Sequence, residues 1–353
     1  MELIIMDKNF QRIGVIEKFE SLIWVERYSR PGDFELYTSV DPYLLSTLTI
    51  GMYLYSIESE YIMIVESISI ETDVEVGNHL TIKGRSLESI LDRRIIWSQT
   101  ILESKIQEGI KKLIEENVIN PEDEERKIDN FIVEEVDDPI IDKIEIEKQY
   151  TGTNLLDAVE ELCLSENLGF KINLDEDNKF VFKLYSGKDR TFKQTDNPYV
   201  IFSPSYENLL NSSYKESSMD FRNVALVAGE GEGSNRKKIS INLDEVTGLE
   251  RRELFVDARD ISSETIYGTL EDSVYYELLR GRGLDKLNNY LYDKTFEGEV
   301  EPHQTFTYGK DYYIGDMVQL INEYGMETES RITEIIRSQS ESGYTVIPTF
   351  TPV

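Results

Sequence analysis

The sequence predicts a β-rich α+β protein: two antiparallel β-barrel domains with an inserted α/β domain and a helical excursion. Short apolar runs separated by turn residues dominate the amino-terminal part of the chain, which favours a barrel or a sandwich. A helical period replaces this pattern after Trp97, and strand-like runs return from Asn223 onward. We therefore expect a first barrel over residues 1–98, a mixed domain over 99–200 and a second barrel over 201–353.

In the first domain, strands are expected where β-branched and aromatic residues are bounded by turn-forming residues. The expected turns are Asp7-Lys8-Asn9, Ser29-Arg30-Pro31-Gly32, Glu58-Ser59-Glu60 and Gly77-Asn78. The expected strands are Leu3–Met6, Arg12–Ile16, Leu22–Tyr28, Phe34–Thr38, Tyr53–Ile57, Tyr61–Ile70 and Leu80–Lys83.

Two helices are predicted in the inserted domain. The first should end at Asn120-Pro121, and the second should begin at Thr153 as N-cap and terminate near Gly169. Strands are then expected at Phe170–Asn173 and Phe180–Tyr185. The apolar positions that predict the helices are Leu102, Ile106, Ile110, Leu113 and Val118 in the first, and Leu155, Val159 and Leu162 in the second.

The last domain is predicted to be a barrel interrupted by a helix at about residues 265–293. Gly281 and Gly283 weaken the centre of that helix. Its apolar positions are Leu270, Val274, Leu278, Leu284, Leu287 and Leu291. The expected strands are Asn223–Ala228, Lys238–Asn242, Arg251–Val256, Met317–Asn322 and Tyr344–Ile347.

The net charge of −31 disfavours nucleic-acid binding, because such a field repels phosphates. Part of the surplus is local: Glu115–Glu147 contains 14 acidic residues, opposed only by Arg126, Lys127 and Lys143. We expect this acidic stretch to be a solvated excursion that is peripheral to both barrels, because so many like charges cannot share a core. Shortening it between Asn120 and Asp137 should then leave the melting temperature nearly unchanged.

No apolar run approaches the ~20 residues of a membrane span. The amino terminus lacks the basic start and apolar core of a secretory signal, so we expect synthesis in a bacterial host cytoplasm without export. A single cysteine, Cys163, permits no internal disulfide and is expected to be a buried apolar group.

The chain carries few of the residues on which catalysis usually depends. Its two histidines, His79 and His303, have no recognisable nucleophile partner. Gly-x-Ser-x-Gly, His-Glu-x-x-His, Cys-x-x-Cys and phosphate-loop motifs do not occur. We therefore assign no catalytic, cofactor-binding or metal-binding residue and expect a protein that is not an enzyme and needs no cofactor.

Two acidic features leave alternatives open. In Gly229-Glu230-Gly231-Glu232-Gly233 the glutamates would repel a phosphate, which favours a flexible strand connection over a phosphate cradle. Carboxylate pairs such as Glu134-Glu135, Asp137-Asp138, or Asp257 with Asp260 supply the residue types of a glycosidase, although 68 acidic residues make such pairs common by chance.

Two arginine pairs are conspicuous because cations are scarce. They are Arg93-Arg94 and Arg251-Arg252. One interpretation is exposed ion pairing with nearby carboxylates, which contributes little stability. The other is a subunit interface, because arginine binds carboxylates of a partner in a planar, bidentate manner.

Several stretches, taken together, resemble the tail-hub family of long-tailed phages and prophages of Gram-positive bacteria, which includes the amino-terminal, non-lytic part of tail-associated lysins. The series runs in order along nearly the whole chain. The stretches are Trp24–Leu36, Gly84–Arg94, Gly152–Leu156, Phe202–Leu210, Gly248–Glu253, Val256–Asp260 and Tyr312–Val318.

The resemblance implies two barrels per subunit and a homotrimeric ring whose central channel continues the tail tube. Six barrels then form a pseudo-sixfold face toward a tail tube or distal-tail protein, while the threefold end holds a spike, fibre or lysin protein. Longer relatives continue into a lytic or receptor-binding domain, whereas this sequence stops at Val353, so we expect wall digestion to belong to another polypeptide.

The leading hypothesis is therefore a structural hub of the tail tip or baseplate, assembled into a virion tail or tail-like particle without stable DNA binding. Two alternatives stay open. One is a carboxylate-based peptidoglycan hydrolase, which would clear a peptidoglycan gel. The other is a cell-wall carbohydrate-binding module, which would be retained on cell walls.

Overall fold

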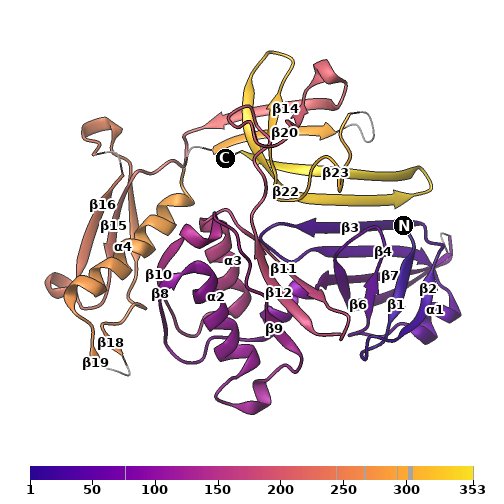
Figure 1. Ribbon diagram of the computed structural model, residues 1–353, viewed down its shortest axis with the longest axis horizontal. Coiled ribbons are helices and arrows are strands. Elements are labelled where there is room, and N and C mark those ends of the chain that lie inside the picture. The colour runs from indigo at the N-terminus through magenta and orange to yellow at the C-terminus, as the bar shows by residue number, and fades with distance from the viewer. Residues whose placement is uncertain (76, 244, 266–267, 292, 301–304, 353) are drawn as a thin grey trace.

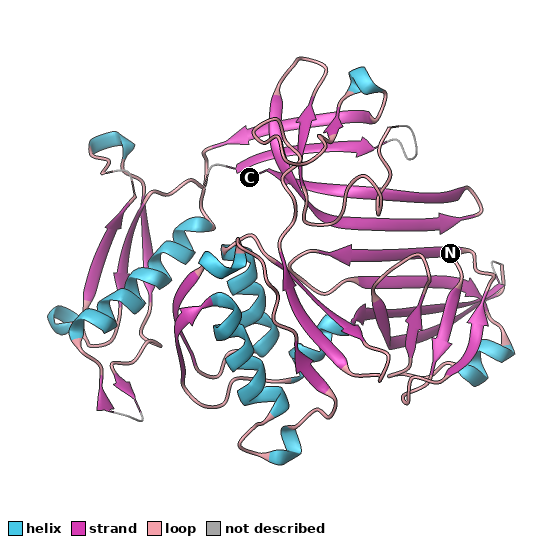
Figure 2. Ribbon diagram, in the orientation of Figure 1, coloured by secondary structure: helices cyan, strands magenta, loops and turns pink. Residues whose placement is uncertain are grey.

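The computed structural model describes residues 1–75, 77–243, 245–265, 268–291, 293–300 and 305–352. Three parts lie side by side in Figure 1: a main sheet, a middle unit of helices and short strands, and an outer unit built on one long helix. Strands hold 41% of the residues and helices 21%, which confirms the β-rich prediction. Figure 2 shows that the longer helices belong to the middle and outer units.

The main sheet is formed by both ends of the chain. Strand β3 (Ser21–Arg27) near the amino terminus pairs antiparallel with β22 (Glu327–Ser340) near the carboxyl terminus. Helix α1 (Pro42–Thr47) connects β4 (Asp33–Ser39) to β5 (Tyr53–Tyr55). In spatial order the strands are β13 (Ile201–Phe202), β21 (Met317–Ile321), β22 (Glu327–Ser340), β3 (Ser21–Arg27), β4 (Asp33–Ser39), β7 (Gly77–Ser86), β6 (Ile62–Asp73), β5 (Tyr53–Tyr55), β1 (Leu3–Met6) and β2 (Arg12–Ile16), and β23 (Gly343–Pro352) pairs with β22.

This sheet is open, so the two predicted barrels are not confirmed. Its end strands are β2 and β13, and no pairing among the described residues joins them. Strand β22 pairs first with β21 and then with β3, which merges amino- and carboxyl-terminal strands into one sheet. The domain limits 1–98, 99–200 and 201–353 stay predictions.

Each half of the main sheet has its own apolar cluster. The cluster over the amino-terminal strands follows the alternation of β3 and β4, in which Leu22, Trp24, Phe34 and Leu36 are buried. The second cluster gathers Phe202, Val318, Ile332 and further apolar residues of the carboxyl-terminal strands. The main sheet therefore consists of two separately packed halves that share one hydrogen-bonded ladder.

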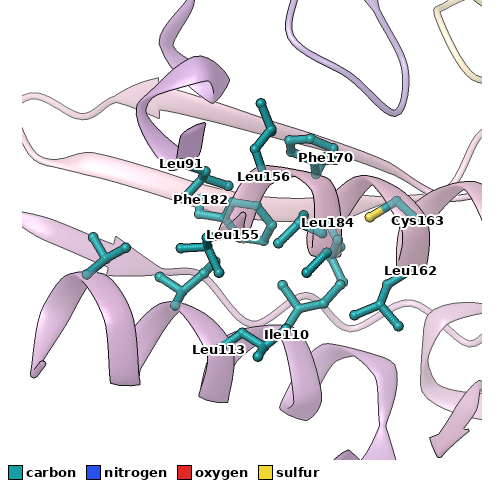
Figure 3. Close-up of a cluster of buried hydrophobic side chains, with 14 of the residues drawn as sticks. Leu91, Ile110, Leu113, Leu155, Leu156, Leu162, Cys163, Phe170, Phe182 and Leu184 are labelled. Atoms are coloured by element: carbon teal, nitrogen blue, oxygen red, sulfur yellow. The ribbon is translucent and has the colours of Figure 1, made fainter. Parts of the chain in front are cut away.

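The middle unit packs two helices against two short sheets, and Figure 3 shows its core. Ile110 and Leu113 from one helix meet Leu155 and Leu162 from the other beside Phe182. Cys163 is buried there as expected, and burial raises the pKa of its thiol. The elements are η1 (Leu87–Arg93), β8 (Thr100–Lys105), α2 (Ile106–Ile114), the π-helical turn η2 (Glu115–Ile119), η3 (Glu124–Arg126), β9 (Phe131–Val133), η4 (Ile141–Lys143), β10 (Glu145–Tyr150), α3 (Leu155–Ser165), β11 (Gly169–Leu174) and β12 (Phe180–Tyr185).

The structure corrects the predicted ends of both helices. Leu102 lies on β8 and not on a helix. Its spacing of four residues from Ile106 matches the helical period by coincidence, which is why the sequence suggested a longer helix. Asn154 rather than Thr153 caps α3, since its side chain accepts from the backbone N–H of Leu156 and Asp157. Gly169 begins β11 instead of ending α3.

Gly169 serves a packing purpose instead. A Cβ at this position would lie 2.4 Å from the ring of Tyr28, so only glycine lets β11 approach the main sheet. The residue that turns the chain after α3 is Asn167, whose φ of 54° is left-handed.

The prediction that the acidic stretch Glu115–Glu147 is a peripheral excursion is wrong. Its apolar residues Val118, Phe131, Ile141 and Ile146 are buried in the core of the middle unit. Strand β9 pairs parallel with β12. The acidic side chains lie between these core positions, so the stretch combines a charged outer surface with an apolar inner one.

The outer unit is a three-stranded sheet covered on one face by α4 (Asp272–Asn288). A helix is present as predicted, but it is shorter than the expected range 265–293: Leu270 precedes its first residue, and Leu291 lies beyond its end and is exposed. A Cβ at Gly283 would lie 2.4 Å from Ile241 and 2.5 Å from Val227, so this glycine lets the helix approach the sheet. The elements are β15 (Val224–Ala228), η6 (Gly233–Asn235), β16 (Lys238–Asn242), η7 (Gly248–Glu250), β17 (Glu253–Asp257), β18 (Glu264–Thr265) and β19 (Gly268–Thr269).

Paired strands carry the chain to the outer unit and back. After η5 (Pro204–Tyr206), β14 (Leu209–Ser217) leads outward, and β20 (Asp293–Val300) returns antiparallel to it. The strands that the sequence groups into one second barrel therefore belong to different sheets: β15, β16 and β17 to the outer unit, and β21 and β23 to the main sheet.

Substitution of Phe131 tests whether the acidic stretch is structural. Phe131 is 3% exposed and contacts Phe180, so Phe131→Ala should leave a cavity and lower the free energy of unfolding by about 3–5 kcal/mol. Ile132→Ala on the same strand is the control, because Ile132 is 41% exposed. Thermal unfolding should show a clearly lower melting temperature for Phe131→Ala and little change for Ile132→Ala. Equal melting temperatures of the two variants would support a peripheral excursion after all.

Candidate functional site: a buried polar junction

Charged and tyrosine side chains meet where the main sheet contacts the middle unit. They come from β3, the loop before β6, the end of β12, the segment before β21, and β22. A cavity of about 710 Å³ lies among them. We call this region the junction.

An ion pair between Glu26 and Arg337 lies at the centre of the junction. The Nε of Arg337 donates to Oε1 of Glu26 at 2.8 Å, and the residues are 1% and 7% exposed. Burial alone would lower the pKa of Arg337, but the charge and hydrogen bonding of Glu26 raise it overall. The Arg337 guanidinium therefore keeps its charge inside the protein.

Neighbouring side chains form further hydrogen bonds with this pair. Glu26 also accepts from the Ser59 hydroxyl at 2.7 Å and from the Tyr308 hydroxyl at 2.8 Å. Arg337 donates to the Tyr344 hydroxyl at 2.8 Å. Burial, followed by the charge of Glu26, raises the pKa of Tyr308 well above its ordinary value. Pairing of this kind makes a buried charge tolerable.

The Ser59 hydroxyl contacts groups that hold it in place. It accepts from the indole N–H of Trp24 and from the backbone N–H of Tyr61, both at 3.1 Å, while donating to Glu26. Glu26, Arg337 and Ser59 thus form a clamp that holds β3 to β22.

Tyr28 and Ser29 attach β3 to the middle unit. The Tyr28 hydroxyl donates to the carbonyl of Asn167 at 3.0 Å, and the Ser29 hydroxyl donates to that of Leu168 at 2.7 Å. The Tyr28 ring meets the Tyr185 ring edge-on at 5.2 Å, and burial raises the pKa of Tyr28 to about 12. These contacts place the start of β11 against the main sheet.

A second buried ion pair fixes the chain that leaves the middle unit. The Nε of Arg190 donates to Asp316 at 2.6 Å, and both side chains are almost completely buried. Asp316 also accepts from the backbone N–H of Lys188 at 2.8 Å and of Tyr313 at 3.0 Å. The segment after β12 is thereby tied to the start of β21.

The structure places the two predicted arginine pairs on different elements. Arg93 is exposed at the end of η1, and Arg94 donates to the carbonyl of Arg126 at 2.8 Å. Arg251 pairs with Glu253 beside β17, and Arg252 donates to the carbonyl of Ser218. These are contacts within the chain, and the subunit-interface role stays a prediction.

Other sequence candidates have local partners. His79 stacks on Tyr37 with ring centroids 4.9 Å apart, and His303 lies outside the described residues. Asp257 binds Arg259 and Arg236, and the hydrogen bond from Arg259 is the main reason that its pKa is lowered to about 2. Asp260 binds a different cation, Arg282. The glycine-rich segment 229–233 connects β15 to β16.

Within the described ranges, no three His, Cys, Asp or Glu side chains gather as a metal site would require. None of the helices in the described part of the chain has the length and apolar character needed to cross a bilayer.

The sequence interpretation missed Glu26, Arg337, Arg190 and Asp316. A signal existed for Glu26, because alternation puts it on the same strand face as Leu22 and Trp24. A carboxylate on an apolar face needs a partner. No local pattern in the sequence points to its partner, because Arg337 lies 311 residues further along the chain.

Comparisons with known proteins point to phage tails. The profile of a family described as "Siphovirus ReqiPepy6 Gp37-like protein" matches residues 2–350. No curated protein matches the sequence.

Solved structures share the fold over almost the full chain. Prophage tail protein gp18 of Listeria monocytogenes has 14% identity and a TM-score of 0.56, covering 99% of this chain and 94% of its own. A 43 kDa tail protein of prophage MuSo2 from Shewanella oneidensis has 12% identity and a TM-score of 0.58, covering 100% and 98%. A tail protein of Neisseria meningitidis has 12% identity and a TM-score of 0.56, covering 99% and 95%.

Removing one partner of the central ion pair should be costly. Glu26→Ala leaves the Arg337 guanidinium buried without its counter-charge, which should lower the free energy of unfolding by about 3–5 kcal/mol. The double variant Glu26→Ala with Arg337→Met should lose less than the sum of the losses of the single variants Glu26→Ala and Arg337→Met. Arg251→Ala, which breaks a pair of more exposed side chains, is the control and should cost under about 1 kcal/mol. Urea unfolding measures all four; additive losses would contradict the clamp.

Glu88 gives a pH-dependent test of the contact between η1 and β11. Its Oε1 accepts from the backbone N–H of Ile172 at 2.8 Å, while Oε2 has no hydrogen-bond partner among the described residues. Burial raises the pKa of Glu88 above its ordinary value.

The native state therefore holds this proton more tightly than the unfolded chain, and stability falls as pH rises above the unfolded pKa of about 4.3. Glu88→Gln should raise the melting temperature at pH 7 and change it little at pH 4. The exposed Glu71→Gln controls for loss of one negative charge. A variant that is less stable than the wild type at pH 7 would show that the carboxylate is needed in its ionised form.

Proposed function

The chain belongs to the Siphovirus ReqiPepy6 Gp37-like protein family, and from this premise we propose that it is a structural hub at the tip or baseplate of a phage tail. In this role three copies close into a ring through heterologous contacts, in which one patch of a subunit fits a different patch of its neighbour. The ring adapts a sixfold tail tube or distal-tail ring to a threefold spike or fibre and continues the DNA channel.

The observation that carries the proposal is the extent of the match. The family profile spans residues 2–350, and folds of prophage tail proteins cover 99% or more of the chain. A shared building block inserted into an unrelated protein would match over one segment only. The correspondence therefore concerns the architecture of the whole chain.

The two halves of the main sheet support the symmetry-adaptor role. Each half packs its own apolar cluster, and β3 and β22 join them side by side. Three subunits would supply six such halves around one axis. The ion pairs at the junction would keep the halves of each subunit at a constant angle, which ring closure requires.

We propose a structural rather than an enzymatic role. The polar groups of the junction support this, because Glu26, Arg337 and Ser59 each bond to groups of the chain itself. A carboxylate-based peptidoglycan hydrolase is the alternative. Clearing of a peptidoglycan gel by the purified chain, lost on substitution of one carboxylate pair, would establish that alternative.

The net charge fits a channel through which DNA passes. A wall rich in Lys and Arg would bind phosphates and stall the passage, whereas an acidic wall lets the polyanion slide. The partners in this proposal are a tail-tube or distal-tail protein on one side and a spike, fibre or lysin protein on the other. A solubilising role of the outer surface is the rival explanation of the charge.

Measurement of mass tests the ring. We expect a trimer by light scattering, either for the chain alone at high concentration or after addition of the neighbouring tail proteins. Arg251→Glu combined with Arg252→Glu should weaken the trimer if that pair lies at the interface; the same change at Arg93 and Arg94 tests the other pair. A stable dimer under every condition would exclude the threefold ring.

A further inference from the structure

A groove of about 700 Å³ lies between β8 and the turn that follows α2, lined by the middle unit and by Thr265 of the outer unit. It is distinct from the junction, and the tail-hub role makes no use of it. Its floor and rim combine one large aromatic ring with amide, hydroxyl and carboxylate side chains. The residues on which the argument depends are Trp97, Gln99, Thr100, Glu116, Asn120 and Glu122.

Trp97 is the aromatic wall of the groove and is 53% exposed. The guanidinium of Arg126 lies over its ring, 4.2 Å from the centroid. Arg126 is itself fixed, because it donates to the carbonyl of Ile95 at 2.6 Å and to the side-chain oxygen of Asn117 at 3.2 Å. One face of the indole is therefore covered by a fixed guanidinium, and both side chains line the groove.

Polar side chains of the groove are also held in place by hydrogen bonds within the chain. Asn117, in the π-helical turn η2, is buried and donates to the carbonyl of Leu113 at 2.9 Å. The hydroxyl of Thr100 donates to Glu116 at 2.7 Å, which fixes that carboxylate across the groove. A π-helical turn is rare and is frequently found at functional sites. Here it sets the Glu116 and Asn117 side chains against β8.

We propose that this groove binds a neutral oligosaccharide. A sugar ring presents an apolar C–H face, which packs on a flat aromatic surface, and a rim of hydroxyls, which bond to planar amides and carboxylates. Trp97 supplies the first surface and Gln99, Asn120 and Glu122 supply the second. The lining carboxylates Glu103, Glu116 and Glu122 outnumber the cations Lys112 and Arg126, so the groove disfavours anionic polymers.

The hydrogen bonding along β8 disfavours an extended peptide as the ligand of this groove. Among the described strands β8 pairs with β10 alone, so a peptide would have to pair with its other edge. The ammonium of Lys112 already donates to the carbonyl of Ile101 on that edge, at 3.0 Å. A lysine across an edge strand blocks further pairing.

The two tryptophans allow a direct test on the full chain. Trp24 is completely buried, so collisional quenching by acrylamide reports on Trp97. Acrylamide is uncharged and is not repelled by the protein. We expect tetramers of N-acetylglucosamine or of glucose to protect Trp97 from quenching, with a dissociation constant on the order of 0.1–1 mM. An oligogalacturonate tetramer, which is anionic, should bind more weakly.

Variants separate this groove from other surfaces. Calorimetric titration should show about tenfold weaker binding for Trp97→Ala and a smaller loss for Gln99→Ala. Tyr324→Ala, at an exposed aromatic residue between β21 and β22, is the control and should bind as the wild type does. The proposal would be overturned if neither neutral tetramer protected Trp97, or if binding survived in the Trp97→Ala variant. Protection of Trp97 by self-association alone would also overturn it, by assigning the groove to a protein contact.

Discussion

The architecture depends on the pairing of β3 with β22, and the Glu26–Arg337 ion pair lies across that pairing. In the ladder Glu26 faces Ile335 and Arg337 faces Trp24, so the two charges are diagonal neighbours on one strand pair. A shift in register would separate them and leave two charges buried without partners, which costs several kcal/mol. The ion pair therefore specifies the register in which the two ends of the chain join.

The position of the middle unit follows from this register. Tyr28 and Ser29, directly after β3, bond to the chain around Leu168, and Asp316, directly before β21, bonds to Arg190. The middle unit is thus held at its entry to β11 and at its exit from β12. Because the two attachments border β3 and β21, which both pair with β22, a rigid orientation of the unit requires that the main sheet be assembled.

Local structure was largely predictable from the sequence, and long-range structure was not. Strands such as Leu3–Met6 and Phe180–Tyr185 were predicted at their observed bounds, because alternation and flanking turns are local signals. The start of the helix at Ile106 was predicted one turn too early, because the spacing from Leu102 to Ile106 suits both a helix and a strand-to-helix transition. The acidic stretch was misjudged because its prediction rested on its overall charge and not on single apolar residues such as Phe131, which is buried. The Arg337 partner of Glu26 and the exposed face of Trp97 depend on contacts between distant segments, which no local pattern encodes.

The antiparallel pair β14–β20 has a consequence for how this protein can vary. Ser217 faces Asp293 at its outer end, so the chain leaves for the outer unit and returns at almost the same point. A segment with adjacent ends can be exchanged for another of any size without displacing the strands beneath it. The stem formed by β14 and β20 is therefore the natural place at which related chains would gain, lose or replace a whole module, and at which a fluorescent or affinity domain could be grafted.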